Sequence, residues 1–113
     1  MRSKIIALSN NKDFKVLLKK KRISNKYVTI FFGYLENKKV NKLNVSFVTK
    51  KKIGNAVKRN KIKRRLRNII NHAIKELIVK FNYSYLVIAK STMLNNEYAN
   101  IKETLFQDLK KIK

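Results

Sequence analysis

The chain has no cysteine and no proline, and its 113 residues include only two glycines and one histidine. Without cysteine, neither disulfides nor thiolate metal sites can hold the fold, and nothing indicates an oxidising compartment. Two separated glycines exclude a glycine-rich phosphate loop, and with it the P-loop class of nucleotide-binding enzymes. The six Asp and Glu residues are too scattered for a two-metal nuclease, and His72 has no second histidine beside it. We therefore predict no catalytic residue and no metal ligand.

Long apolar runs are also missing. No uncharged run approaches the roughly 20 residues that a membrane-spanning helix needs. Near the start of the chain, the apolar stretch at residues 5–8 is too short for the core of a secretory signal. We therefore expect a cytoplasmic protein with no membrane partner.

Positive charge dominates what the chain does contain. The 29 Lys and Arg residues outnumber the 6 Asp and Glu residues, which gives a formal net charge of +23. So large a charge opposes compaction through self-repulsion and exceeds what solubility needs, so it indicates a polyanionic partner, for which nucleic acid is the best candidate. The hydrophobic fraction of 44% is enough for one buried core. We predict a single nucleic-acid-binding domain over residues 1–113.

The spacing of apolar residues predicts six elements in the order helix, strand, strand, helix, strand, helix. Helices are expected at residues 10–18, 56–80 and 97–110, and strands at 27–35, 43–49 and 83–89. The first two strands are expected to pair antiparallel across a turn at 36–42, and residues 19–26 are interpreted as a basic connector. The predicted fold class is α+β, an α/β sandwich with a small central sheet and helices packed on it.

The basic segment at residues 50–67 concentrates the charge. It reads KKKIGNAVKRNKIKRRLR, in which ten of the eighteen residues are Lys or Arg, and no acidic residue occurs between Glu36 and Glu76. With Asn55 as the expected helix cap, the helical period places on the buried side of the long helix Ile62, Leu66, Ile69, Ile70, Ala73 and Leu77. The opposite side then carries Asn60, Lys61, Arg64, Arg67, Asn68 and Asn71, flanked by Lys63 and Arg65. This unneutralised ridge of guanidinium, ammonium and amide groups predicts phosphate and sugar contacts.

The same segment resembles a known family signature. The residues that carry the resemblance are Lys51, Lys52, Ile53, Gly54, Ala56, Val57, Arg59, Asn60, Lys61, Lys63 and Arg64. In this order they are similar to the signature of the bacterial ribonuclease P protein component, with a lysine pair, an Ala-Val pair and an Arg-Asn-Arg core. Lys61 stands where the family usually has the second arginine of that core. The size of the chain and the order of its elements fit the family over nearly the full length.

The resemblance implies a subunit of a ribonucleoprotein endonuclease that removes the 5′ leader from precursor tRNA. It implies that the RNA subunit performs the chemistry, that the partners are ribonuclease P RNA and precursor tRNA, and that no protein partner is required. No cofactor is expected on the protein alone, whereas Mg²⁺ is expected for the RNA-catalysed reaction. The resemblance also implies a left-handed β-α-β crossover around the long helix, which is an exception to the usual right-handed rule.

Two sets of site residues follow from this comparison. The expected RNA-binding residues are Lys51, Lys52, Asn55, Arg59, Asn60, Lys61, Lys63, Arg64, Arg65, Arg67 and Asn68. A cleft between the first helix and the sheet is expected to receive the single-stranded leader through Phe14, Leu18, Phe32 and Tyr34. Strand alternation separates Phe32 and Tyr34 from Phe31 and Leu35 without saying which face is open, and we favour the Phe32 face. Packing in the core is the competing interpretation for each aromatic residue.

Two other functions fit the charge as well. A general RNA-binding module, such as a ribosomal protein or RNA chaperone, would bind precursor and mature tRNA with little discrimination. An architectural DNA-binding protein would prefer duplex DNA and would not need an open cleft for a single strand.

Overall fold

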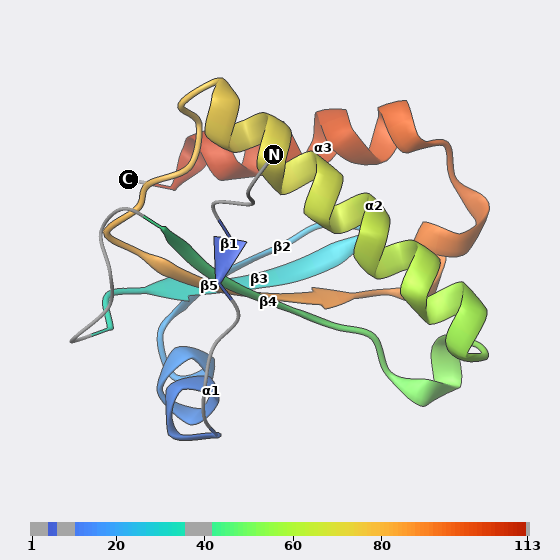
Figure 1. Ribbon diagram of the computed structural model, residues 1–113, viewed down its shortest axis with the longest axis horizontal. Helices are drawn as coiled ribbons and strands as arrows, with labels where there is room; N and C mark the ends of the chain where they lie inside the picture. Colours follow the sequence, from blue (N-terminus) through green and yellow to red (C-terminus); the bar gives the residue numbers. More distant parts are fainter. Residues whose placement is uncertain (1–4, 7–10, 36–41, 113) are drawn as a thin grey trace.

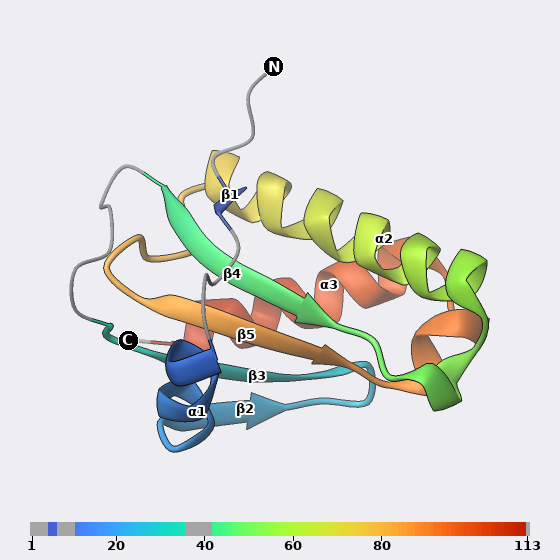
Figure 2. The same ribbon diagram turned by 60° about the horizontal axis from the view of Figure 1, so that its bottom comes forward.

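The protein consists of a five-stranded mixed sheet with helices on both faces (Figure 1). The structure is a computed structural model that describes residues 5–6, 11–35 and 42–112. The elements are β1 (Ile5–Ile6), α1 (Asn11–Leu18), β2 (Lys21–Ser24), β3 (Val28–Gly33), β4 (Leu43–Val48), η1 (Lys51–Ile53), α2 (Ala56–Lys75), β5 (Ser84–Ala89), η2 (Ser91–Asn95) and α3 (Tyr98–Lys111). The strand order is β1-β4-β5-β3-β2. Helices α2 and α3 lie on one face of the sheet, and α1 lies on the other (Figures 1 and 2).

The three predicted helices and three predicted strands are confirmed, but their pairing differs from the expectation. The antiparallel pair of residues 27–35 and 43–49 is wrong, because β5 lies between β3 and β4. Tyr85 of β5 is level with Phe32 of the antiparallel β3 and with Val45 of the parallel β4. The turn expected at 36–42 falls, except for Lys42, outside the described residues, as does Asn10, the first residue of the helix expected at 10–18.

The basic segment at residues 19–26 is not a plain connector. Its residues Lys21–Ser24 form β2, which pairs antiparallel with β3 from Lys21↔Phe32 to Ser24↔Thr29. Only Ile23 in this strand has strong β-propensity, so the strand exists because β3 offers a free edge. Charged side chains on such an edge strand also disfavour pairing with another chain.

The connection from β4 through α2 to β5 is left-handed. In Figure 2, which looks at the α1 side of the sheet, the arrows of β4 and β5 both point to the right, β4 lies above β5, and α2 lies behind them. A right-handed crossover would place the helix in front of the sheet in this view. The expectation from the family resemblance is therefore confirmed.

Two apolar clusters stabilise the sheet, one on each face. The larger lies between the sheet and the α2–α3 layer, where Leu66, Ile69, Ile101 and Leu105 are completely buried. The smaller lies under α1 and consists of Leu17, Phe31, Leu35 and Leu86. Because α1 has only eight residues, it covers a small part of its face. The α1 side of the sheet thus keeps room for a ligand.

Helix α2 ends at Lys75, about one turn before the predicted end. The N–H of Ile78 donates to the carbonyl of Ala73 at 2.9 Å, and that of Leu77 donates to Ile74 at 3.1 Å, which is a Schellman closure. Leu77, expected on the buried stripe, instead has a φ of 57° and is 90% exposed. The prediction was wrong because apolar spacing continues past the residue at which the chain turns towards β5.

Candidate nucleic-acid interface

The basic segment begins with a short anchored turn. Ile53 of η1 is buried in the main core and holds the neighbouring Lys51 and Lys52, both exposed, beside the start of α2. Asn55 caps the helix, since its Oδ1 accepts a hydrogen bond from the N–H of Lys58 at 3.0 Å. This confirms the predicted cap. It also shows that the oxygen of Asn55, counted among the RNA-binding residues, already has a partner within the protein.

Helix α2 presents most of the predicted RNA-binding residues on its outer surface. Asn60, Lys61, Arg64, Arg67 and Asn68 are exposed, and Lys63 and Arg65 are half-buried. No carboxylate among the described residues lies within ion-pair distance of these cations; Asp108 on α3 pairs instead with Lys111 at 3.7 Å. The outer surface of α2 therefore carries a dense positive charge without internal neutralisation.

Two residues near the start of α2 show how the helix is oriented. Val57 is 77% exposed, because five residues separate it from the buried Ile62 and turn it about 140° away. Arg59 lies three residues before Ile62 and seven before Leu66, so it shares the buried side of the helix and is half-buried. Its Nε is enclosed and has no hydrogen-bond partner in the part of the chain that the structure describes. Arg59 thus lies at the border between the buried side of α2 and its exposed cationic surface.

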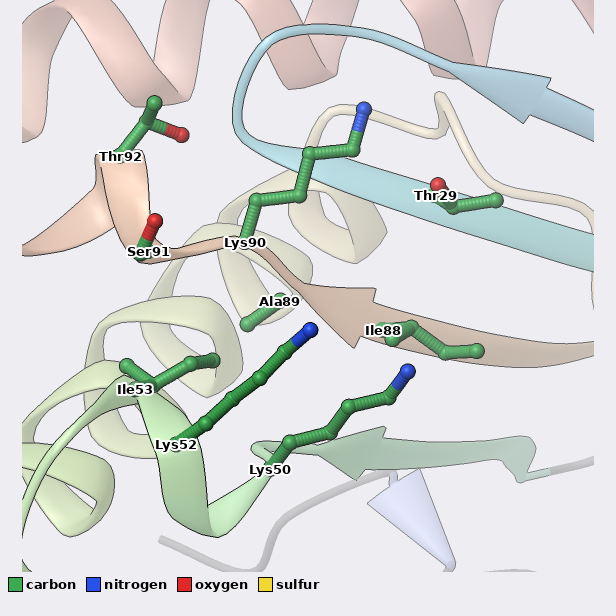
Figure 3. Close-up of a pocket in the computed structure, with 9 residues that line it drawn as sticks. All are labelled: Thr29, Lys50, Lys52, Ile53, Ile88, Ala89, Lys90, Ser91 and Thr92. Carbon is green, nitrogen blue, oxygen red and sulfur yellow. The ribbon is translucent and has the colours of Figure 1, made fainter.

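A hollow of about 630 Å³ opens at the end of the sheet beyond α1 (Figure 3). Thr29 of β3 and Ile88 of β5 line it, and the side chains of Lys50 and Lys52 extend over it from the β4–α2 connection. Lys90 lies at its other side, where its Nζ donates to Ser24 Oγ at 2.9 Å and to the carbonyl of Asn25 at 2.6 Å. Lys90 is therefore held by the β2–β3 turn, whereas Lys50 and Lys52 have no such partner among the described residues.

A second hollow, of about 360 Å³, lies at the β4 edge between α1 and α2. Phe14 and Phe47 contribute apolar surface, and Lys63 and Arg67 contribute charge. The guanidinium carbon of Arg67 lies 6.0 Å from the centre of the Phe47 ring, at cation–π distance. Aromatic rings beside positively charged side chains are typical of sites that bind single-stranded RNA. Phe47 was not among the predicted site residues, because a phenylalanine within a strand is usually part of the core.

The four residues expected in the leader cleft do not come together. Phe32 is buried in the core beneath α2 and α3, with its ring 6.0 Å from that of Tyr83, so it lies on the face opposite to α1. Its neighbour Phe31 packs against the α1 cluster instead, so the favoured Phe32 face was wrong. Phe14 borders the β4-edge hollow, while Leu18 and Tyr34 are exposed. Strand alternation separates the two faces but cannot tell which one a distant helix will cover.

The described residues offer little else for chemistry. They contain no group of three or more His, Asp or Glu side chains placed to hold a metal ion. No helix among them combines the length and the apolar composition needed to cross a bilayer.

Comparisons with known proteins agree with one another. A family model described as Ribonuclease P matches residues 3–113. The ribonuclease P protein component of Streptococcus pneumoniae is 36% identical over 104 residues, which cover 91% of this chain and 80% of the relative. The RNase P protein from Staphylococcus aureus superposes with a TM-score of 0.69 at 25% identity, covering 100% of this chain and 99% of that chain. The RNase P protein from Thermotoga maritima shares the fold with a TM-score of 0.79, at 23% identity over 96% of this chain and 98% of the other.

Proposed function

The chain belongs to the ribonuclease P family as a protein component, and from this membership we propose that it binds ribonuclease P RNA through α2 and the 5′ leader of precursor tRNA on the α1 side of the sheet. The observation that carries the proposal is the cationic outer surface of α2, which no carboxylate of the described residues neutralises. Lys and Arg side chains on such a surface release condensed counterions from an RNA backbone, which is the main source of affinity for nucleic acid.

The leader site is proposed on the sheet face that α1 leaves open. Lys50 and Lys52 supply charge for backbone phosphates above the hollow lined by Thr29 and Ile88 (Figure 3). Phe14 of α1, which borders the β4-edge hollow, supplies apolar surface on which a base can stack. Single-stranded RNA suits this face because its unstacked bases and its backbone can be contacted at the same time.

Catalysis is assigned to the RNA subunit. The described residues form no carboxylate or histidine cluster that fits Mg²⁺, so we assign the expected Mg²⁺ to the RNA and derive no step through it on the protein. The protein contributes binding and position. Its positive field screens the repulsion between catalytic RNA and substrate, and the lysines above the sheet orient the leader.

The proposal is tested by comparing precursor tRNA with mature tRNA as ligands of the reconstituted ribonucleoprotein. We expect the particle to bind the precursor more tightly, and the double variant Lys50→Ala/Lys52→Ala to lose that preference while still binding the catalytic RNA. Lys75→Ala/Lys80→Ala removes the same charge from exposed positions beyond the ridge and serves as the matched control. Equal binding of precursor and mature tRNA by the wild-type particle would favour a general RNA-binding module instead.

A further inference from the structure

A third group of cations lines the side of α2 that faces η2. Lys58, Lys61 and Arg65 border a hollow of about 200 Å³ between the two elements, and Met93, Leu94 and Asn95 of η2 form its opposite wall. Lys58 and Lys61 are exposed and Arg65 is half-buried. None of the three forms an ion pair with another described residue. The hollow therefore has three positive charges along about two turns of α2, with no carboxylate of the described residues paired to them.

The wall of this hollow is firmly held. Met93 is completely buried in the main core, and its N–H donates to the carbonyl of Lys90 at 3.1 Å. The Asn96 side chain donates to the carbonyl of Thr92 at 2.6 Å, which closes the turn after η2. The three cations thus lie along a fixed groove and not on a free helix surface.

This groove lies on the opposite side of α2 from the β4-edge hollow. Arg65 borders the α2–η2 groove and Arg67 borders the β4-edge hollow. These arginines are two positions apart, so their side chains leave the helix axis in directions about 200° apart. The same rotation separates Lys61 from Lys63. Since a helix with its side chains is about 10–12 Å across, one phosphodiester strand cannot follow both sides. A single RNA backbone bound along the outer surface of α2 would therefore leave either Lys61 and Arg65 or Lys63 and Arg67 without a phosphate contact.

We propose that the α2–η2 groove is a second phosphate site, which binds the sugar–phosphate backbone of an RNA segment different from the one beside Lys63 and Arg67. Helix α2 then lies as a wedge between two backbone segments and reduces their mutual repulsion from both sides. The inference rests on the proposed use of α2 as the RNA interface. It adds Lys58, which the family signature does not include, and gives Arg65 a target separate from that of Arg67.

The test compares three double variants of the full chain, each of which removes two positive charges. Lys58→Gln/Arg65→Gln alters the α2–η2 groove, Lys63→Gln/Arg67→Gln alters the β4-edge side, and Lys75→Gln/Lys80→Gln is the control. Affinity for ribonuclease P RNA is measured over a range of salt concentrations, and hydroxyl-radical footprints identify the protected RNA segments. Thermal melts of all three variants, and the single variant Lys61→Gln as a milder probe of the groove, separate lost binding from lost folding.

Both interface variants are expected to bind about tenfold or more weakly at 0.1 M salt and to reduce the magnitude of the salt slope by roughly 1.8, because two phosphate contacts are lost in each. Each is expected to lose protection at a different RNA segment. The inference alone is overturned if the groove variant behaves like the control while the β4-edge variant binds weakly, or if both variants lose protection at the same segment. Unchanged affinity in both variants would overturn the proposed RNA interface of α2 as well.

Discussion

Asn25 donates a side-chain hydrogen bond to Asp108 Oδ2 at 2.8 Å and so joins the β2–β3 turn to α3, across 83 positions of sequence. The Oδ1 atom of the same asparagine accepts hydrogen bonds from the N–H groups of Tyr27 at 2.8 Å and Val28 at 3.0 Å. Asp108 is only 8% exposed, so its carboxylate depends on Asn25 and on Lys111 for partners. Lys90, at the rim of the sheet-face hollow, donates to the backbone of Asn25. Asn25 thus links the turn to the last helix through its side chain, and to the rim of the proposed leader site through its backbone carbonyl.

Replacing Asn25 with alanine is expected to lower the free energy of unfolding by about 2–3 kcal/mol, because two backbone donors and the buried Asp108 carboxylate lose a partner. Urea denaturation measures the change. Asn100→Ala, at an exposed position of α3, is the control and is expected to change stability by less than about 0.5 kcal/mol. A loss for Asn25→Ala no larger than that of the control would show that the link contributes nothing.

Leu77→Gly is expected to stabilise the protein by about 0.5–1 kcal/mol. The leucine occupies the left-handed position of the closure after α2, with a φ of 57°, where a Cβ atom costs roughly 1–2 kcal/mol and glycine is favoured. Little burial is lost, since the side chain is 90% exposed. Leu77→Ala keeps the Cβ atom and is expected to show no such gain in thermal unfolding. A glycine variant less stable than the alanine variant would contradict this account.

Tyr85 makes stability depend on alkaline pH. Burial raises its pKa to about 12 from the usual 10, although the hydrogen bond that its oxygen accepts from the Lys80 N–H, at 3.2 Å, partly opposes the shift. Between pH 10 and 12 the unfolded chain releases this proton first. The stability that Tyr85 contributes below pH 10 is therefore lost as the pH rises, by up to about 1.4 kcal/mol per pH unit.

Tyr85→Phe cannot titrate and so isolates this contribution. Near pH 8 the variant is expected to be about 1 kcal/mol less stable than the wild type, because the hydrogen bonds to the Lys80 backbone are lost. The difference is expected to shrink between pH 10 and 12. Parallel stability curves of the two proteins in urea over this range would rule out the burial effect.

Arg64→Ala is expected to weaken binding to ribonuclease P RNA several-fold at 0.1 M salt and to reduce the magnitude of the salt slope by about 0.9. Arg64 is exposed at the middle of the outer surface of α2, so its loss removes about one phosphate contact and no packing. Lys75→Ala, near the end of the same helix, should leave both quantities nearly unchanged. If the two variants bind equally well, the outer surface of α2 is not the interface.

The parts of the fold that could be predicted depend on nearby residues. The cap of α2 at Asn55 and the cationic composition of residues 50–67 follow from consecutive side chains, and both are found in the structure. The buried stripe of α2 also follows from local spacing, since Ile62, Leu66 and Ile69 are buried as predicted. Leu77 is the exception, because the helix ends before it.

The pairing of the strands could not be predicted in the same way. The insertion of β5 between β3 and β4, and the formation of β2, depend on contacts between segments far apart in sequence. The same dependence decided the leader site. Whether Phe31 or Phe32 faces α1 is set by where that helix packs, which strand alternation does not contain. The left-handed crossover was predicted from the family resemblance alone. The general rule for β-α-β connections would have predicted a right-handed one.

The most direct test of the central claim is cleavage of 5′-labelled precursor tRNA at low Mg²⁺ concentration by the protein alone, by a bacterial ribonuclease P RNA alone, and by the two mixed. We predict release of the 5′ leader in the mixture and neither protein-only cleavage nor efficient RNA-only cleavage. No stimulation by the protein would contradict its role as the subunit that helps the RNA hold its substrate, and cleavage by the protein alone would contradict the assignment of catalysis to RNA.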